Sequence, residues 1–342
     1  MNSMIGVDIG MGAIKMVAIE RDEKKSFLTS IGEARIPRVD WLKGENKNKS
    51  IVKVAEALKS LLSDLKIKEK RVVSCLPEEE VVSRLVRLPP LKESEIKDAL
   101  KFEAETFVPY PLDKVLIDYE VMEEDEAGRL TVFVIAARNV VIDSYIKLFK
   151  AAGLELMALE SPAVAMRRAV VNSIKAESNV VIMDMGEKYS DVVSLNKEKI
   201  IFTRALSMGG ESLTRAISIN LGLDMASAEE YKKAYGLRES ELEGKIRNAI
   251  LPTYTSMAEE LRKASVLFKE ETGENIDLVV LSGGGANLPG LAEELTKLLG
   301  LEVQVLQPFL RIDTTRVSVP LDLNSEGCRF TLAAGLALRE IK

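Results

Sequence analysis

Histidine is absent from this chain of 342 residues, and cysteine occurs only twice. Because histidine is the commonest general base and the commonest metal ligand, any chemistry has to rest on carboxylates, lysines, backbone amides and bound Mg²⁺. The two cysteines, Cys75 and Cys328, lie in different halves of the chain and do not have the spacing of metal ligands. This pattern favours two buried free thiols over a disulfide.

Long apolar runs are missing as well. No segment approaches the roughly 18 uninterrupted apolar residues that a membrane span needs, and residues 1–7 lack the successive regions of a signal peptide. We therefore expect a cytoplasmic protein. A net charge of −6 with both signs interspersed disfavours nucleic acid as a partner. The length and the 46% hydrophobic content allow two sizeable cores, so two domains are expected.

The chain does contain three glycine turns, each at the end of an apolar, β-like run: Asp8-Ile9-Gly10-Met11-Gly12, Asp184-Met185-Gly186 and Gly283-Gly284-Gly285. Glycine lets backbone amides approach phosphate oxygens, and successive amides in such turns form an anion-binding concavity. The aspartates of the first two turns are 184 − 8 = 176 residues apart. One such turn alone is ordinary turn chemistry, but three predict a nucleotide held between two related domains. Asp8 and Asp184 would flank Mg²⁺, through water.

The first glycine turn is expected to close a hairpin. Residues 13–19 are mostly apolar, as in a strand that returns along its neighbour. This places Lys15 beside the turn, where it is either a solvated residue of an edge strand or a point charge on a β- or γ-phosphate. The other common phosphate loops, G-x-x-x-x-G-K-[ST] and G-x-G-x-x-G, do not occur at these turns.

The order of the predicted elements repeats along the chain. Strands are expected over residues 4–10, 13–20 and 26–36, then a helix over 50–65 that begins at Ser50 as its N-cap, then a strand over 71–76. Strands over 179–185, 191–195 and 200–206, a helical segment and a strand over 276–281 follow the same scheme. Three strands, a helix and a strand are typical of a ribonuclease-H-like domain, so the chain is expected to hold two of them.

Two insertions interrupt this scheme. Residues 81–160 are expected to form a β-α-β-β-α-β unit whose last strand covers 155–159. A helical insertion follows over 209–273, with its long helix broken or kinked at Pro252. A connecting helix is expected to begin at Ser161 as its N-cap, with Pro162 in its first turn, and 327–341 are expected to form a closing helix. The expected domain bounds are 1–80 with 326–342, 81–160, 161–208 with 274–325, and 209–273.

Over its full length the chain resembles the actin-like ATPase superfamily, an α/β fold of duplicated ribonuclease-H-like domains with two inserted subdomains. The turn at Asp8 with Lys15 is similar to that family's first phosphate motif, the turn at Asp184 with Glu187 to its second, and residues 281–286 to its adenosine motif. Residues 161–166 and 330–336 fall where its two hinge helices cross. The resemblance implies ATP and Mg²⁺ as ligands.

Two further segments fit the same resemblance. Residues 228–232 are similar to the family's A-E-x-x-K helix, in which Glu229 and Lys232 would reach the ribose and the adenine. Gly209 and Gly210 resemble the turn that lets the backbone pass near the sugar. Without the resemblance, these segments would be a charged helix face and a helix start. Glu187 and the following lysine stand where faster hydrolases carry Asp or Gly, so at most slow ATPase activity is expected.

Within the superfamily, the first insertion resembles the PilM family of type IV pilus assembly proteins, through residues 88–90, 103–113 and 118–119. This resemblance implies an ATP-binding scaffold on which a groove at the insertion binds the N-terminal peptide of the membrane protein PilN by strand addition. Contact with the inner membrane and its other pilus assembly proteins would be through partners. The alternatives are a self-associating, FtsA-like polymer, a GspL-like secretion component and a small-molecule kinase, for which no substrate base stands out.

Overall fold

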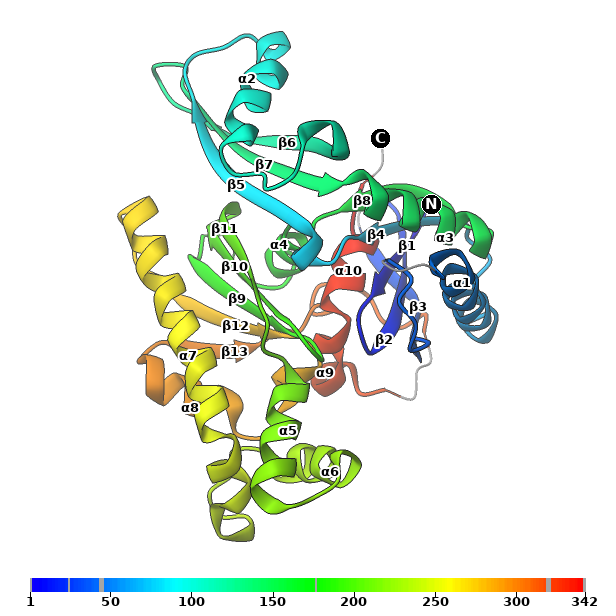
Figure 1. Ribbon diagram of the computed structural model, residues 1–342, viewed down its shortest axis with the longest axis vertical. Helices are drawn as coiled ribbons and strands as arrows, with labels where there is room; N and C mark the ends of the chain where they lie inside the picture. The colour runs from blue at the N-terminus through cyan, green and yellow to red at the C-terminus, as the bar shows by residue number, and fades with distance from the viewer. Residues whose placement is uncertain (1, 24, 43–45, 176, 318–320, 341–342) are drawn as a thin grey trace. The chain divides into compact units, whose positions relative to one another are not determined.

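The computed structural model describes residues 2–23, 25–42, 46–175, 177–317 and 321–340 (Figure 1). It divides into two compact units, each described by itself below. The first unit comprises Met1–Arg168, Ile312–Val317 and Leu332–Lys342, and the second Ala169–Arg311 and Ser318–Thr331. The predicted α/β class is confirmed. The finer division into four subdomains stays a prediction.

The core of the first unit is a five-stranded sheet in the order β3-β2-β1-β4-β8. Its strands are β1 (Asn2–Ile9), β2 (Ala13–Arg21), β3 (Ser26–Arg35), β4 (Arg71–Cys75) and β8 (Glu155–Glu160). The first three strands are antiparallel neighbours, whereas β4 and β8 run parallel to β1. The apolar stripes of α1 (Lys47–Asp64) and α3 (Asn139–Ala152) share one hydrophobic cluster with β1 and β2, so the two helices lie side by side on this sheet (Figure 1).

The core of the second unit repeats this topology. Its sheet has the order β11-β10-β9-β12-β13, built from β9 (Val180–Met185), β10 (Ser190–Asn196), β11 (Lys199–Leu206), β12 (Leu278–Ser282) and β13 (Glu302–Val305). The antiparallel and parallel pairings match those of the first sheet. The associated helices are α5 (Gly210–Leu221), α6 (Met225–Tyr235), α7 (Lys245–Thr272) and α8 (Leu291–Leu299). The predicted duplication is therefore confirmed at the level of sheet topology.

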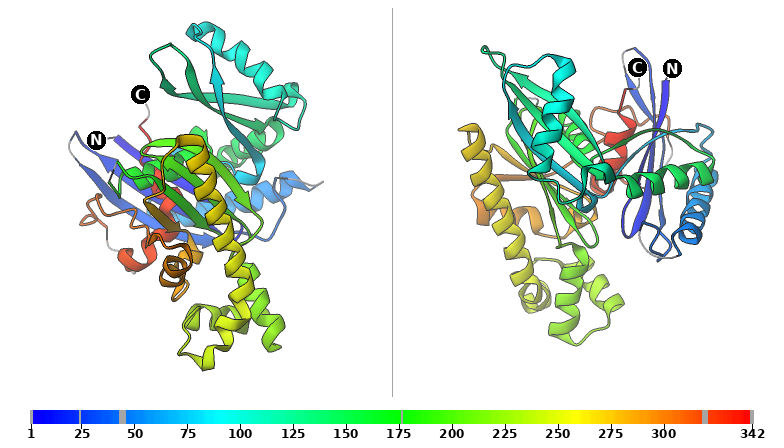
Figure 2. Two further views of the ribbon diagram at one scale, coloured as in Figure 1. Left: turned by 90° about the vertical axis from the view of Figure 1, so that its left-hand side faces the viewer. Right: turned by 45° about the horizontal axis from the view of Figure 1, so that its top comes forward.

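An inserted three-stranded sheet in the order β5-β7-β6 belongs to the first unit (Figure 2). It consists of β5 (Val81–Leu88), β6 (Val115–Glu124) and β7 (Leu130–Arg138), and α2 (Glu93–Glu105) packs on one of its faces. The predicted β-α-β-β-α-β order is present, but its last two elements join the core of the first unit rather than the inserted sheet. β8 pairs with β4 rather than with the inserted sheet, and α3 buries Tyr145, Leu148 and Phe149 in the cluster that it shares with α1. A strand's sequence does not show which sheet it joins.

The connecting elements are α4 (Pro162–Val171), α9 (Leu323–Glu326) and α10 (Thr331–Ala337), and short 3₁₀ turns are η1 (Glu78–Glu80), η2 (Leu112–Lys114), η3 (Leu242–Gly244), η4 (Gly284–Asn287) and η5 (Gly327–Phe330). The chain passes from the first unit to the second within α4, contributes Ile312–Val317 to the first unit, and returns to it again at the start of α10.

Three local predictions are wrong. Ser50 lies inside α1 and is buried, because the helix starts three residues earlier, after Asn46. The Ser161 hydroxyl has no hydrogen-bond partner among the described residues, so it does not cap α4. The predicted break in α7 is absent, since the helix runs through Pro252: a proline removes only one backbone donor, and the helix buries an apolar face on both sides of it. A kink at Pro252 stays a prediction. The predicted closing helix over 327–341 is shorter in the structure, because Gly327–Phe330 form a 3₁₀ turn and α10 ends at Ala337; residue 341 lies outside the described residues.

Candidate functional site

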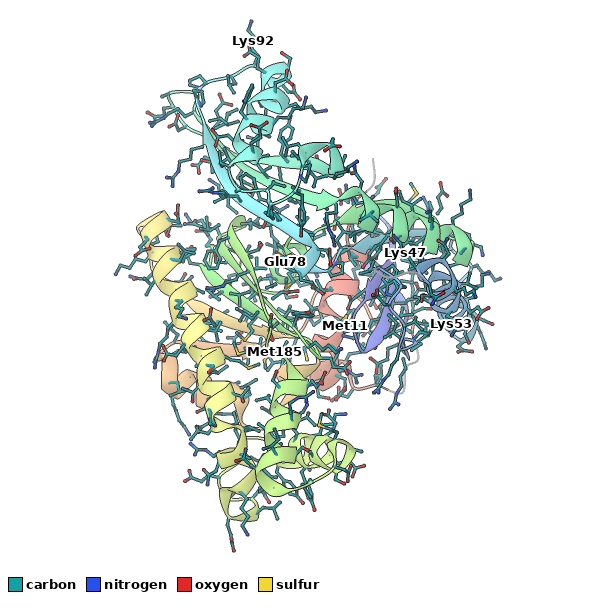
Figure 3. The ribbon with its side chains drawn as sticks, viewed as in Figure 1. Met11, Lys47, Lys53, Glu78, Lys92 and Met185 are labelled. Carbon is teal, nitrogen blue, oxygen red and sulfur yellow. The ribbon has the colours of Figure 1, made fainter. Side chains whose placement is uncertain are left out.

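The glycine turn of the first unit closes the hairpin between β1 and β2, as predicted. The amide of Gly10 donates a hydrogen bond of 3.0 Å to the carbonyl of Ala13. Asp8 and Lys15 are directly opposite in the ladder, and 3.9 Å separates the Lys15 Nζ from the Asp8 Oδ2. Asp8 is buried, whereas Met11 at the tip of the turn is 51% exposed (Figure 3). The structure thus brings Asp8, Gly10, Met11, Gly12 and Lys15 together at one end of this sheet.

The second glycine turn has the same hairpin geometry in the second unit. The amide of Gly186 donates to the Tyr189 carbonyl at 3.0 Å, and Met185 ends β9 just before it (Figure 3). Asp184 is in register with Ser282 at the end of the parallel strand β12. The Ser282 hydroxyl donates to the Asp184 Oδ1 at 2.6 Å. This partner was not predicted, because sequence patterns do not give the register of two strands about 100 residues apart.

The third glycine turn packs against the end of β9. Gly283 has a φ of +78°, and a Cβ at this position would lie 2.6 Å from the Met185 carbonyl oxygen. Both the left-handed backbone and the close approach therefore require glycine. Gly284 faces open space, with no atom within 4 Å of where its Cβ would be. The second and third turns are consequently neighbours at one edge of the second sheet, together with Gly285.

The start of α5 also rests on the second turn. The amides of Gly210 and Glu211 donate to the carbonyls of Gly186 and Glu187, at 3.0 and 2.8 Å. A Cβ on Gly209 would lie 2.5 Å from the Glu187 carbonyl oxygen, so only glycine permits this approach. Two of the N–H groups that a helix start leaves without intrahelical partners are thereby satisfied within the protein. The structure brings Gly209 and Gly210 to the predicted second phosphate motif.

Lys232 ties α6 to this helix start. The residue is 9% exposed. Its ammonium donates hydrogen bonds to the Gly210 carbonyl, the Thr214 hydroxyl and the Glu229 Oε2, at 3.0, 2.9 and 2.7 Å. An ammonium has three donors, so all three are used within the protein. Burial lowers the pKa of the Lys232 ammonium, and the bond to Glu229 opposes that change. Lys232 therefore holds the two helices together, a role that the sequence did not predict.

The same hydrogen bonds change the pKa of the Glu229 carboxyl group. Burial raises the pKa of its carboxyl group, but hydrogen bonds from Lys232 and Thr214 lower it, and the pKa lies below its ordinary value of 4.5. A carboxyl group with a depressed pKa stabilises the fold above its ordinary pKa, and this contribution is lost as the pH falls further. The stabilisation that comes from the Glu229 carboxylate should therefore be present near neutral pH and be lost in acid.

We expect Lys232→Met to lower the free energy of unfolding by roughly 2 kcal/mol near pH 7, less than for a fully buried pair because Glu229 is partly exposed. The loss should shrink in acid, as the pH falls through the depressed pKa of Glu229 and its carboxylate becomes protonated. Urea unfolding at several pH values measures this. The control is Lys233→Met, since Lys233 also contacts Glu229 but its side chain is 72% exposed, and the expected change is within about 0.5 kcal/mol. Equal losses for both variants at all pH values would contradict this assignment.

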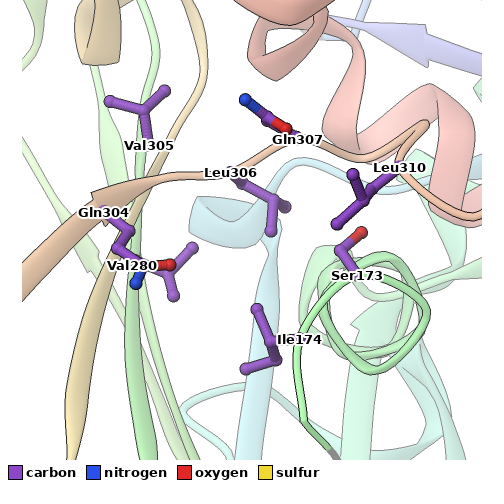
Figure 4. Close-up of a pocket in the computed structure, with 8 residues that line it drawn as sticks. All are labelled: Ser173, Ile174, Val280, Gln304, Val305, Leu306, Gln307 and Leu310. Atoms are coloured by element: carbon purple, nitrogen blue, oxygen red, sulfur yellow. The ribbon is translucent and has the colours of Figure 1, made fainter.

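A cavity of about 370 Å³ lies elsewhere in the second unit (Figure 4). It is lined by Ser173 and Ile174, which follow α4, and by residues of β12, β13 and the loop after β13. None of the predicted site residues lines it. The predicted site consists of turns at strand ends, and this cavity is not part of it.

Comparison with known proteins identifies the family. The sequence model described as type IV pilus assembly protein PilM matches residues 6–341. The chain belongs to the PilM family. A chain from the solved PilM-PilN type IV pilus biogenesis complex is 26% identical, with a TM-score of 0.84 over 98% of this chain and 97% of that one. The fold is therefore the predicted actin-like fold.

The curated relatives are cell division proteins. FtsA of Enterococcus faecalis is 23% identical over 347 residues, which is 89% of this chain and 78% of that protein. FtsA of Streptococcus pneumoniae is 27% identical over 180 residues, so that match spans 47% of this chain and only 39% of the relative. No helix in the described ranges has both the length and the apolar character to cross a bilayer.

Proposed function

We propose that this chain is an ATP-binding scaffold of type IV pilus assembly that binds the N-terminal peptide of PilN at the inner face of the membrane. The observation that carries this proposal is the match to the PilM-PilN complex, which extends over 98% of the chain with a TM-score of 0.84. Binding of the partner, rather than rapid turnover of ATP, would be the task of the protein. Contacts with other pilus assembly proteins and self-association would add to this role.

The glycine turns are the proposed ATP contacts. In the second unit, Gly209 and Gly283 pack closely against the protein's own backbone, whereas Gly284 faces open space. The backbone at Gly284 can therefore be approached by phosphate oxygens. Among the described residues, no group of three or more Cys, Asp or Glu side chains could hold a metal ion. Mg²⁺ usually keeps several waters and binds the phosphates, which fits single carboxylates such as Asp8 and Asp184 as acceptors for its water.

The proposed peptide site is the free edge of the inserted sheet. β6 is an outer strand, and an outer strand presents backbone groups to which an extended segment can add. The Tyr119 amide of this strand donates to the adjacent Asp118 carboxylate at 2.9 Å. Leu116 and Val121 on this strand are 58% and 43% exposed. They offer apolar contact beside the open backbone.

The charge of β6 suits a membrane protein's cytoplasmic segment. The strand and the turn after it carry many exposed carboxylates: Asp118, Glu120, Glu123, Glu124 and Glu126. Cytoplasmic segments next to membrane spans are rich in Lys and Arg. A basic peptide would therefore be attracted to this edge, and acidic partners would be repelled.

The family motif at residues 103–113 fixes this sheet to the core. Tyr110 lies over the guanidinium of Arg138, with 5.3 Å from the Arg138 Cζ to the ring centre. Arg138, the last residue of β7, in turn donates to the carboxylate of Glu80, which is 7% exposed and precedes β5. A buried charge pair of this kind specifies one arrangement, because either partner alone would be an uncompensated charge. The motif thus holds the peptide-binding edge in place.

The proposal is tested by capture of full-length PilN from the same organism, in detergent, with the intact chain as bait and with or without Mg-ATP. We expect PilN to be retained and PilN without its N-terminal segment to be lost. Val121→Lys should weaken retention, because it puts a like charge where a basic peptide binds. The matched control is Val52→Lys, since Val52 of the same unit is 51% exposed on α1. Retention of the truncated PilN would contradict the proposal.

A further inference from the structure

The carboxylate of Asp184 accepts a hydrogen bond from a buried hydroxyl on the neighbouring strand. Ser282 is the last residue of β12 and has no exposed surface. Its hydroxyl donates to the Asp184 Oδ1 at 2.6 Å, and the two residues are directly opposite in the parallel ladder. Because no solvent reaches Ser282, water does not compete for this bond, and a hydrogen bond to a charged acceptor is among the stronger ones.

The backbone next to Ser282 is fixed from the other side. The Cys328 carbonyl of η5 accepts hydrogen bonds from the Gly283 amide at 3.0 Å and from the Thr331 hydroxyl at 2.8 Å. The Ser282 hydroxyl lies 3.5 Å from the same carbonyl oxygen. The glycine turn, the hydroxyl and the residues that lead into α10 are therefore joined in one buried cluster. Of the two acceptors near the Ser282 hydroxyl, the Asp184 carboxylate is the closer one.

We propose that Ser282 is a positioning residue for Mg-ATP, which orients the Asp184 carboxylate toward the water shell of the cation. This inference rests on the nucleotide binding proposed above. A carboxylate that is already oriented loses less freedom when it accepts hydrogen bonds from metal-bound water, and so binds more tightly. In the alternative role, the hydroxyl only joins β9 to β12. The two roles differ in how far the effect of the hydroxyl depends on Mg²⁺.

The test compares two variants that each remove one fully buried hydroxyl from the same sheet, Ser282→Ala and Ser194→Ala. Ser194 lies on β10 with no exposed surface, and its hydroxyl has no hydrogen-bond partner among the described residues. Calorimetric titration of the full chain is run with Mg-ATP and with ATP in EDTA. We expect Ser282→Ala to weaken Mg-ATP binding about ten-fold, and ATP binding in EDTA less than about two-fold. Ser194→Ala should match the wild type in both.

Ser282→Cys provides a second variant of nearly the same size with a weaker donor. It should show an intermediate loss, and it keeps the test decisive if Ser282→Ala does not fold. Wild-type affinity of the Ser282 variants for Mg-ATP would overturn the inference while leaving the proposed function intact. Equal losses with and without Mg²⁺ would also overturn it, since they indicate a purely structural bond. If the wild type itself does not bind ATP, both the inference and the proposed nucleotide site fail.

Discussion

Asp184→Ala should weaken binding of Mg-ATP by at least about ten-fold, and Asp8→Ala should have a comparable effect. Each change removes a carboxylate that would accept hydrogen bonds from metal-bound water. The fold should persist, because both residues are at strand exits rather than inside a hydrophobic cluster. Calorimetric titration with Mg-ATP measures the affinity, and thermal unfolding checks the fold.

The loss of affinity caused by Asp8→Ala should depend on Mg²⁺. Lys15 lies opposite Asp8, 3.9 Å from its carboxylate, so Asp8→Ala removes a nearby negative charge and leaves the ammonium more attractive to phosphate. Binding of ATP in EDTA should therefore not weaken in Asp8→Ala. Asp98→Ala serves as the control, since its side chain on α2 is 76% exposed and is paired with Lys101 in a surface contact. Unchanged affinity for Mg-ATP in both site variants would rule out this assignment.

Gly335→Ala should destabilise the first unit by roughly 3 kcal/mol. A Cβ at this position would lie 2.0 Å from the Ala165 carbonyl oxygen, where α10 crosses α4. The crossing is also fixed by Arg168, which donates to the Gly335 carbonyl at 2.6 Å and to the buried Glu160 carboxylate. The neighbouring helix backbone cannot move away without breaking these bonds, so the added methyl group forces the helices apart.

The control for this change is Gly153→Ala. Gly153 has a φ of +73°, but no atom lies within 4 Å of the position of its Cβ, so alanine there should cost only about 1–2 kcal/mol of backbone strain. Urea unfolding monitored by circular dichroism compares the two variants. A smaller loss for Gly335→Ala than for Gly153→Ala would show that the helices can separate easily at this crossing.

The sequence predicted the elements of both sheets well, because apolar runs bounded by glycine turns mark strands whatever their partners are. It did not predict that β8 joins the first sheet, since the segment reads equally well as a strand of the insertion. The prediction that α1 begins at Ser50 was wrong for a similar reason. A serine before an apolar stripe fits an N-cap, but tertiary packing extends α1 by one turn and buries that serine.

The glycine turns could be predicted because the need for a residue without a Cβ is visible in the local sequence. The partners of their side chains could not. Ser282 lies opposite Asp184 because of the register of β9 and β12, which the sequence does not show. Lys232 donates hydrogen bonds to Gly210, Thr214 and Glu229, which belong to two helices. The A-E-x-x-K resemblance marked Lys232 as a residue of interest. The structure adds that its ammonium already has protein partners for each donor.

The most direct test of the scaffold proposal is a titration of the intact chain with a labelled N-terminal peptide of PilN, followed by fluorescence anisotropy with and without Mg-ATP. The account predicts saturable binding of one peptide per chain in Mg-ATP, and no binding of a peptide with the same composition in scrambled order. Absence of saturable binding in both nucleotide conditions would contradict it.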